Sequence, residues 1–186
     1  MIPLGVLGSA RYVTAAPPIS DDFNRADGPL GAAWTVISGV VSVASQAANN
    51  GPNTNSVARH NTVILADHFA QARATPSGGS GDPAVLVRFS ASGMTCYMGR
   101  YSTGSGAWEI HKYVAGAATR IGFTVDSTPA SPWLIRLEAQ GSTLRLYGDG
   151  VLKVTVTDST ITGNTRVGLR LNAFNNTIDD FTAGPI

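Results

Sequence analysis

From residue 34 onward, apolar and polar residues alternate with a period of two, in short blocks rich in Val, Ile, Thr and aromatic residues. This alternation is typical of half-buried β-strands, and the Gly, Asn, Asp, Ser and Pro residues between the blocks are typical of turns. A helical turn or two is an open alternative only in the window 61–73. The pattern predicts strands at residues 34–38, 40–45, 69–75, 84–90, 94–101, 107–114, 119–125, 133–139, 143–148, 151–157, 166–171 and 177–182.

Two hairpins are expected within this pattern. In LRLYGDGVLKVTV, Asp149-Gly150 forms a two-residue turn, because both central positions of a type I′ turn need positive φ. The alternation around this turn directs five apolar side chains inward: Leu144, Leu146, Leu152, Val154 and Val156. The segment SGMTCYMGRYSTGSGAWEIHKY predicts a second hairpin with the Gly-rich STGSG loop at its tip. Many short strands joined by such turns predict an all-β fold, an antiparallel β-sandwich of the jelly-roll kind.

The chain of 186 residues suits one domain with a short arm. We expect residues 1–18 to form an extended N-terminal arm and linker, and residues 19–186 to form the sandwich. The apolar side chains of the arm are expected to dock against the domain's own surface or a neighbouring subunit, which makes them assembly residues: Ile2, Leu4, Val6 and Leu7.

The composition excludes several classes of partner. Charged residues make up only 13% of the chain and the net charge is +1, so no electrostatic footprint for nucleic acid or an anionic membrane is present. No apolar run reaches the roughly 18 residues that cross a bilayer, which argues against membrane insertion. The single cysteine, Cys96, excludes an internal disulfide and lies between Met94 and Met98 at strand spacing, as a buried apolar residue would.

Catalytic motifs are not evident. A glycosidase needs two carboxylates held close together, which alternate acidic residues on one strand supply most directly. The only glutamates, Glu109 and Glu138, each lack an acidic partner two residues away, and Asp179 and Asp180 are adjacent, so a strand sends them to opposite faces. No nucleophile-elbow, Walker or zinc-protease motif occurs. The histidines at 60, 68 and 111 lack metal-ligand spacing, so structural roles are favoured.

The outward face of the second hairpin is a candidate glycan-binding surface. If Met94, Cys96 and Met98 face the core with Trp108 and Ile110, five aromatic and polar residues share the opposite face: Tyr97, Tyr101, Glu109, His111 and Tyr113. Aromatic faces pack on sugar C–H surfaces while polar neighbours bond the hydroxyl groups. The alternative is cross-strand aromatic pairing that stabilises the sheet, or packing under a loop or partner subunit.

The phrase Asp-Asp-Phe opens the domain at residues 21–23 and closes it at residues 179–181. Phe23 and Phe181 are expected to enter the core where the first and last strands pair. This pairing brings four carboxylates together, and they repel one another unless a cation compensates. Calcium is the natural cation, because it accepts carboxylate and carbonyl oxygens in flexible geometry. Alternatively, two acids cap turns and Arg25 neutralises the rest without metal.

These segments carry a family resemblance. DDFNRADGPLGAAW, WTVISGVVSV, WLIRLEAQGSTLRLYGDGVLKVTVTDSTITGNTRVGLRL and IDDFTAG resemble the concanavalin A-like lectin and glucanase jelly rolls in the laminin G-like style. The resemblance spans residues 20–184 and is closest to copies in minor tail proteins of phages that infect actinobacteria. The start, IPLGVLGSARY, is similar to the leader of many such tail and virion proteins. The glucanases' E-x-D-x-E strand is missing, and their terminal calcium site could match only Asp22 and Asp180, or Asp21 and Asp179.

The resemblance implies a non-enzymatic virion protein, a minor tail protein that displays its sandwich to a host-surface glycan. We expect it to attach to other virion proteins through the arm, and to be a homo-oligomer, with a trimer favoured. It would be assembled in the host bacterial cytoplasm and exposed on the released particle. The alternatives are a capsid decoration or cementing protein, and a glucanase-like enzyme that cleaves glycans.

Overall fold

A computed structural model describes residues 18–186 of the protein, apart from 53–54, 78–80 and 127–128. The expected arm, with Ile2, Leu4, Val6 and Leu7, therefore lies outside the described residues. The regular elements within the described ranges are β-strands, and none of these ranges holds a helix long and apolar enough to span a membrane.

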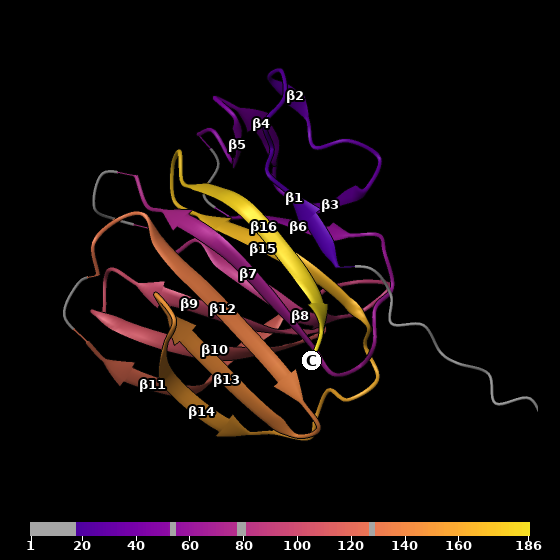
Figure 1. Ribbon diagram of the computed structural model, residues 1–186, viewed down its shortest axis with the longest axis vertical. Coiled ribbons are helices and arrows are strands. Elements are labelled where there is room, and N and C mark those ends of the chain that lie inside the picture. The colour runs from indigo at the N-terminus through magenta and orange to yellow at the C-terminus, as the bar shows by residue number, and fades with distance from the viewer. Residues whose placement is uncertain (1–17, 53–54, 78–80, 127–128) are drawn as a thin grey trace, which may run out of the picture.

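The strands form two antiparallel sheets (Figure 1). Sheet A has nine strands, in the order β14 (Val151–Thr157), β13 (Thr143–Gly148), β12 (Trp133–Gln140), β7 (His68–Thr75), β16 (Thr177–Pro185), β5 (Ala47–Asn49), β4 (Ser42–Ala44) and β2 (Gly28–Pro29), with β1 (Ile19–Asp21) paired to β16. Sheet B has seven, in the order β11 (Ala117–Val125), β10 (Ala107–Val114), β9 (Cys96–Ser102), β8 (Ala84–Phe89), β15 (Arg166–Asn172), β6 (Asn55–His60) and β3 (Trp34–Ser38).

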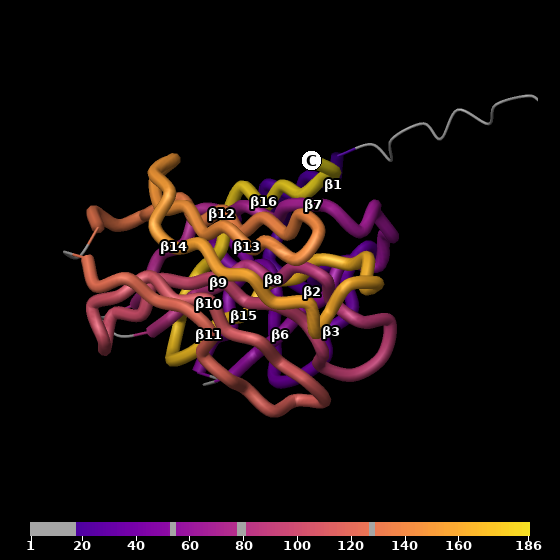
Figure 2. Tube along the Cα trace, turned by 90° about the horizontal axis from the view of Figure 1, so that it is seen from below, coloured from indigo at the N-terminus to yellow at the C-terminus, as the bar shows by residue number. Residues whose placement is uncertain are grey.

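The main core lies between the two sheets, which Figure 2 shows as stacked layers. Leu137 and Leu146 of sheet A and Val85, Trp108 and Leu169 of sheet B belong to it, each with no exposed surface. A second apolar cluster consists of side chains on the outer face of sheet B: Val57, Ala84, Leu86, Phe89, Cys96, Met98 and Tyr113. Sheet B is therefore packed on both of its faces.

The predicted all-β sandwich is confirmed, and most strand predictions agree with the structure to within two residues. Asp149 and Gly150 have φ of 51° and 80°, as a type I′ turn requires. The window 61–67 contains no helix, and the short strands β2 and β5 were missed together with β6. Leu152, predicted to point inward, is 50% exposed, because the register between β13 and β14 shifts at Leu146/Tyr147 and turns it away from the core.

The two Asp-Asp-Phe phrases meet where the chain ends pair. Strand β1 runs antiparallel to β16, with Asp21 opposite Phe181. Phe23 and Phe181 are both fully buried, and each packs against the indole ring of Trp34, at centroid distances of 6.0 and 5.1 Å. The Trp34 indole N–H donates to Asp21 Oδ2 at 2.7 Å. The prediction that the two aromatics join the first and last strands is confirmed.

Candidate functional site

One row of side chains crosses the outer face of sheet B from its β11 edge towards its middle. The register pairs Phe123 with Glu109, Glu109 with Arg100, Arg100 with Ala84, and Ala84 with Arg170. Directly paired residues of neighbouring strands share a face, so these five side chains lie on the same side of the sheet. We call this line the central row. It joins an exposed aromatic ring to a set of polar and charged groups.

The predicted glycan face was wrong for Tyr97 and Tyr101. Both are fully buried in the core between the sheets, because the register places Tyr101 opposite Trp108, whose side chain points inward. Cys96 and Met98, expected in the core, lie on the outer face instead.

The other three predicted residues, Glu109, His111 and Tyr113, do share the outer face. Tyr113 lies opposite Cys96 and packs in the outer apolar cluster, with 9% of its surface exposed. Of the five predicted residues, the structure thus brings three together on one surface.

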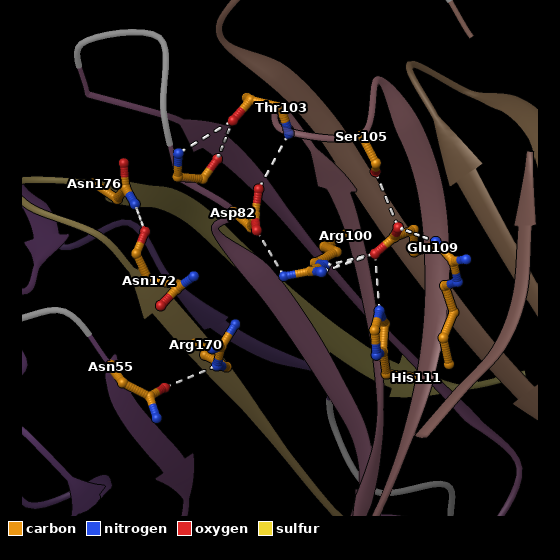
Figure 3. A network of polar contacts seen from close by, with 12 residues as sticks. Asn55, Asp82, Arg100, Thr103, Ser105, Glu109, His111, Arg170, Asn172 and Asn176 are labelled. Carbon is orange, nitrogen blue, oxygen red and sulfur yellow. Dashed lines mark hydrogen bonds and ion pairs between the residues drawn. The ribbon is translucent and has the colours of Figure 1, made fainter. Parts of the chain in front are cut away.

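Glu109 is the centre of a polar network on this face (Figure 3). Its Oε2 accepts hydrogen bonds from Arg100 Nε at 3.0 Å, Arg100 Nη2 at 2.8 Å and His111 Nε2 at 2.8 Å. Its Oε1 accepts from Arg120 Nη1 at 2.9 Å and Ser105 Oγ at 3.0 Å. Five donors surround a carboxylate of which only 3% is exposed, so its position is fixed.

The network continues from Arg100 to the start of β8. Arg100 Nη1 donates to Asp82 Oδ2 at 2.7 Å, and the other carboxylate oxygen of Asp82 accepts from the backbone N–H of Thr103 at 3.1 Å. We use the name arginine–carboxylate network for five residues: Asp82, Arg100, Glu109, His111 and Arg120. Because each arginine in it contacts a carboxylate, the network holds its side chains without a ligand.

The electrostatics of Glu109 do not suit a general acid. Burial alone raises the pKa of this carboxyl, but the hydrogen bonds from His111, Arg100 and Arg120 outweigh burial and lower the pKa to about 2. Burial lowers the pKa of His111, and the neighbouring Arg100 opposes the effect of Glu109. At neutral pH Glu109 is therefore an anion and His111 a neutral donor, since a carboxylate can only accept.

Phe123 and Arg120 are functional candidates that sequence reasoning missed. The Phe123 side chain is 53% exposed, and the Arg120 guanidinium lies over its ring at 4.3 Å. Counting from the turn at residues 115–116 places Arg120 opposite His111, so Arg120 could have been found. The bulge at Ile110/His111 then shifts the register by one residue and sets Phe123 opposite Glu109, whereas an uninterrupted count would have placed Phe123 opposite Trp108, on the inner face.

We call the pairing of β1 with β16 the terminal seam. The acidic residues there do not form a calcium site in the described part of the chain. Asp22 and Asp180 line a hollow of about 430 Å³ together with Asp21. Both oxygens of Asp21 already accept from Arg25, at 2.6 and 3.1 Å, and Asp180 pairs with Arg73 at 3.2 Å. No group of three or more metal-ligating side chains occurs among the described residues. The donor set therefore does not fit calcium. Arg25 compensates Asp21, as the alternative proposed, and Arg73 compensates Asp180, whereas Asp22 and Asp179 form no ion pair with a described residue.

The remaining histidines and the cysteine have packing roles. His68 is fully buried and its Nε2 accepts the backbone N–H of Arg88 at 2.9 Å, while burial lowers its pKa to about 4. His60 packs against the ring of Trp34 at a centroid distance of 5.0 Å. Burial strongly raises the pKa of the Cys96 thiol, which makes it a poor nucleophile.

Comparison with known proteins identifies the fold. No protein-family model and no curated protein matches the chain. Among solved structures, the carbohydrate binding module CBM66 from Bacillus subtilis matches with a TM-score of 0.73 and 17% identity, over 82% of this chain and 95% of that module. The chain has a jelly-roll fold.

Other solved structures with this fold include a β-glucanase and the exoplasmic/lumenal domain of VIP36. The β-glucanase of Bacillus licheniformis matches with a TM-score of 0.63 and 10% identity, over 93% of this chain and all of that enzyme. The exoplasmic/lumenal domain of VIP36, in a form bound to Ca²⁺ and Man3GlcNAc, matches with a TM-score of 0.64 and 8% identity, over 84% of this chain and 85% of that one. At these identities the likeness extends to the fold alone.

Proposed function

We propose that the protein is a non-catalytic glycan-binding domain, and that its binding surface is the outer face of sheet B around Phe123. The observation that carries the proposal is the exposed Phe123 ring, held by Arg120 beside a fully bonded polar network. An aromatic ring packs on the C–H face of a sugar, and fixed polar neighbours bond its hydroxyl groups. The carbohydrate-binding proteins that share the fold support this proposal.

The carboxylates support a non-catalytic role. Glycoside hydrolysis usually needs a carboxylic acid with a raised pKa opposite a second carboxylate. The pKa of Glu109 is instead lowered to about 2, and the raised pKa among the described carboxyl groups belongs to Asp179, on strand β16 of the other sheet. Because Glu109 is bonded by five donors, its role is to position its neighbours rather than to transfer a proton.

A glycan array tests the binding proposal. The wild-type protein should bind at least one class of bacterial surface glycan, and Phe123→Ala should weaken that binding about tenfold, since an aromatic contact is worth about 1.4 kcal/mol. The matched control is Phe69→Ala, because Phe69 lies on the outer face of sheet A under Arg136, at 3.7 Å. Equal binding by wild type and Phe123→Ala, or loss in the Phe69→Ala control alone, contradicts the assignment of the surface.

We further propose that the domain serves on a bacteriophage virion as a minor tail protein. Support comes from the resemblance of residues 20–184 and of the opening IPLGVLGSARY to actinobacteriophage tail proteins. Deleting residues 2–12 should abolish incorporation into particles and leave a folded, soluble domain. Normal incorporation of the deletion variant contradicts the anchoring role, and imaging of labelled protein on intact particles separates a tail position from a capsid decoration.

The second candidate function is glycan cleavage, because glucanases share the fold. A reducing-end assay on cell-wall polysaccharides of actinobacteria should give no product. Product that is formed by the wild type and not by a Glu109→Gln variant shown to be folded would establish an enzyme and remove the non-catalytic proposal.

A further inference from the structure

The outer face of sheet B carries more positive than negative charge. Two carboxylates contact arginines on this face, those of Asp82 and Glu109. Five arginines lie on the face: Arg59, Arg100, Arg120, Arg166 and Arg170. Arg100 and Arg120 pair with these two acids. The other three form no ion pair with any described residue. The net charge of +1 on the whole chain conceals this local excess.

Arg170 is the least compensated of these arginines. Only 8% of its surface is exposed, yet its guanidinium makes a single hydrogen bond among the described residues, from Nε to Asn55 Oδ1 at 3.0 Å. Its Nη1 is buried and has no partner there. Figure 3 shows the contact with Asn55 and shows Arg170 on the same side of the sheet as Asp82 and Arg100.

An unpaired buried guanidinium is costly for a folded protein, because the charge loses its hydration without gaining a partner. Burial lowers the pKa of Arg170 and the nearby Arg100 acts in the same direction, while Tyr113 and the Asp82 carboxylate oppose this shift without reversing it. A bound anion would supply the missing partner, and a carboxylate or phosphate fits a guanidinium through two parallel hydrogen bonds.

The central row relates Arg170 to the proposed glycan surface. Phe123 lies at one end of the row on β11, and Arg170 lies on β15, four strands away. Neighbouring strands are about 4.8 Å apart, so the backbones at the two ends are about 19 Å apart. One sugar cannot contact both ends, whereas an oligosaccharide lying across the strands can. Arg100 and the small Ala84 lie between them in the same row.

We propose that the ligand is an acidic oligosaccharide, whose carboxylate or phosphate group pairs with Arg170 while another sugar of the same oligosaccharide, several units away, packs on Phe123. This inference rests on the proposed glycan-binding function and specifies its ligand class. Arg100 lies on the other side of Ala84, where it already pairs with Glu109 and Asp82, and Arg59 and Arg166 add positive charge beyond the row.

The test uses an array of uronate-containing and phosphate-containing oligosaccharides, each beside its carboxyl-reduced or dephosphorylated counterpart, followed by calorimetric titration of the best pair. The acidic member should bind at least tenfold more tightly at 50 mM salt, and the ratio should shrink at 250 mM salt because the pairing is ionic. Whether the uronate or the phosphate set binds identifies the anion. Arg170→Met should remove the preference, and Arg145→Met, on the outer face of sheet A, should leave it unchanged.

A stability measurement on the same variants separates recognition from structure. Arg170→Met should unfold at the same or a higher temperature than wild type, because an apolar side chain of similar length replaces an unpaired charge. A strong loss of stability would show that Arg170 is structural and overturn the inference. Arg170→Lys provides a second variant that keeps the charge but not the paired donors, and it should bind with intermediate affinity.

The remaining outcomes of the array decide between the acidic-glycan inference and the broader glycan-binding proposal. Binding of neutral and acidic glycans with equal affinity overturns the inference and leaves the glycan-binding proposal intact. Failure of every glycan on the array overturns both. If duplex DNA binds as tightly as the acidic glycan and Arg170→Met weakens both equally, the surface is a general polyanion site and the acidic-glycan assignment is wrong.

Discussion

The two outer faces of the sandwich differ in how deeply their charged side chains are buried and in how many partners these side chains have. On sheet A, Arg136 pairs with Glu138 two residues along the same strand, Glu138 also accepts from Tyr147 on the neighbouring strand, and Arg73 pairs with the exposed Asp180. On sheet B, Glu109 is nearly inaccessible and takes its donors from strands on both sides of it. Single pairs that are partly exposed add less stability, whereas a buried cross-strand network is costly to disrupt and rigid when complete. The difference identifies sheet B as the face built to hold polar groups in place.

Replacement of the central acid on each face should separate them most clearly. Glu109→Gln leaves Arg120 without a counter-charge and Arg100 with Asp82 alone, and it should lower the free energy of unfolding by about 3–5 kcal/mol, the usual cost of breaking a buried pair. Glu138→Gln breaks a more exposed pair and should cost about 1 kcal/mol or less. Urea unfolding of the two variants measures both values. Equal losses would remove the distinction between the faces.

Lowering the pH should destabilise the folded protein through Glu109 as well. The pKa of Glu109 is lowered from 4.5 to about 2 in the folded protein, so its contribution is present above pH 4.5 and is lost as the pH falls towards 2. The loss should amount to about 3 kcal/mol at the acid end, since each unit is worth about 1.4 kcal/mol. Chemical unfolding between pH 6 and 2 follows it. The Glu109→Gln variant should lack this component, and a wild-type-like acid profile in that variant is inconsistent with the account.

The terminal seam also contains one buried and one exposed acid, and smaller effects are expected there. Asp21 has a side chain only 12% exposed and accepts from Arg25 and the Trp34 indole, whereas the Asp180 side chain is 57% exposed. Asp21→Asn should therefore cost about 2 kcal/mol, the scale of a hydrogen bond to a charged group. Asp180→Asn should cost under about 0.5 kcal/mol, as exposed pairs do. Thermal or urea unfolding compares them, and a larger loss for Asp180→Asn would contradict this assignment.

The smallest expected effect concerns calcium. Because arginines already compensate Asp21 and Asp180, a chelator should leave the melting temperature unchanged, as ligand bound only to the native state must raise stability. Differential scanning fluorimetry with and without excess Ca²⁺ measures this. A rise with Ca²⁺ that is lost in Asp22→Asn would restore the metal site that the sequence suggested.

The strands could be predicted because their signals are local. The alternation of side chains and the Asp149-Gly150 turn each depend on a few neighbouring residues. The repeated Asp-Asp-Phe sequence is also a local signal, and it predicts the pairing of the chain ends once a strand is assumed at each end. Strand β6 was missed because NSVARH is short and mixes polar with apolar residues. Its place between β15 and β3 depends on pairings far apart in the sequence.

Which side chains of β9 face the core between the sheets could not be predicted from the residues of β9 alone. Cys96, Tyr97 and Met98 are all buried, because sheet B packs apolar clusters on both faces, so alternation no longer distinguishes inside from outside. Only the partner strand decides, through Trp108 opposite Tyr101. The placement of Arg100 and Arg170 on either side of Ala84 was equally hidden, since it needs the pairing of β8 with both β9 and β15.

The central claim is that the outer face of sheet B binds glycan. The most direct measurement is a ¹H–¹⁵N NMR titration of the wild-type protein with the oligosaccharide that the array selects. The account predicts the largest shifts at Phe123, His111 and Arg100 and at the side-chain Nε of Arg170. Shifts confined to sheet A, around Phe69 and Arg136, would contradict it.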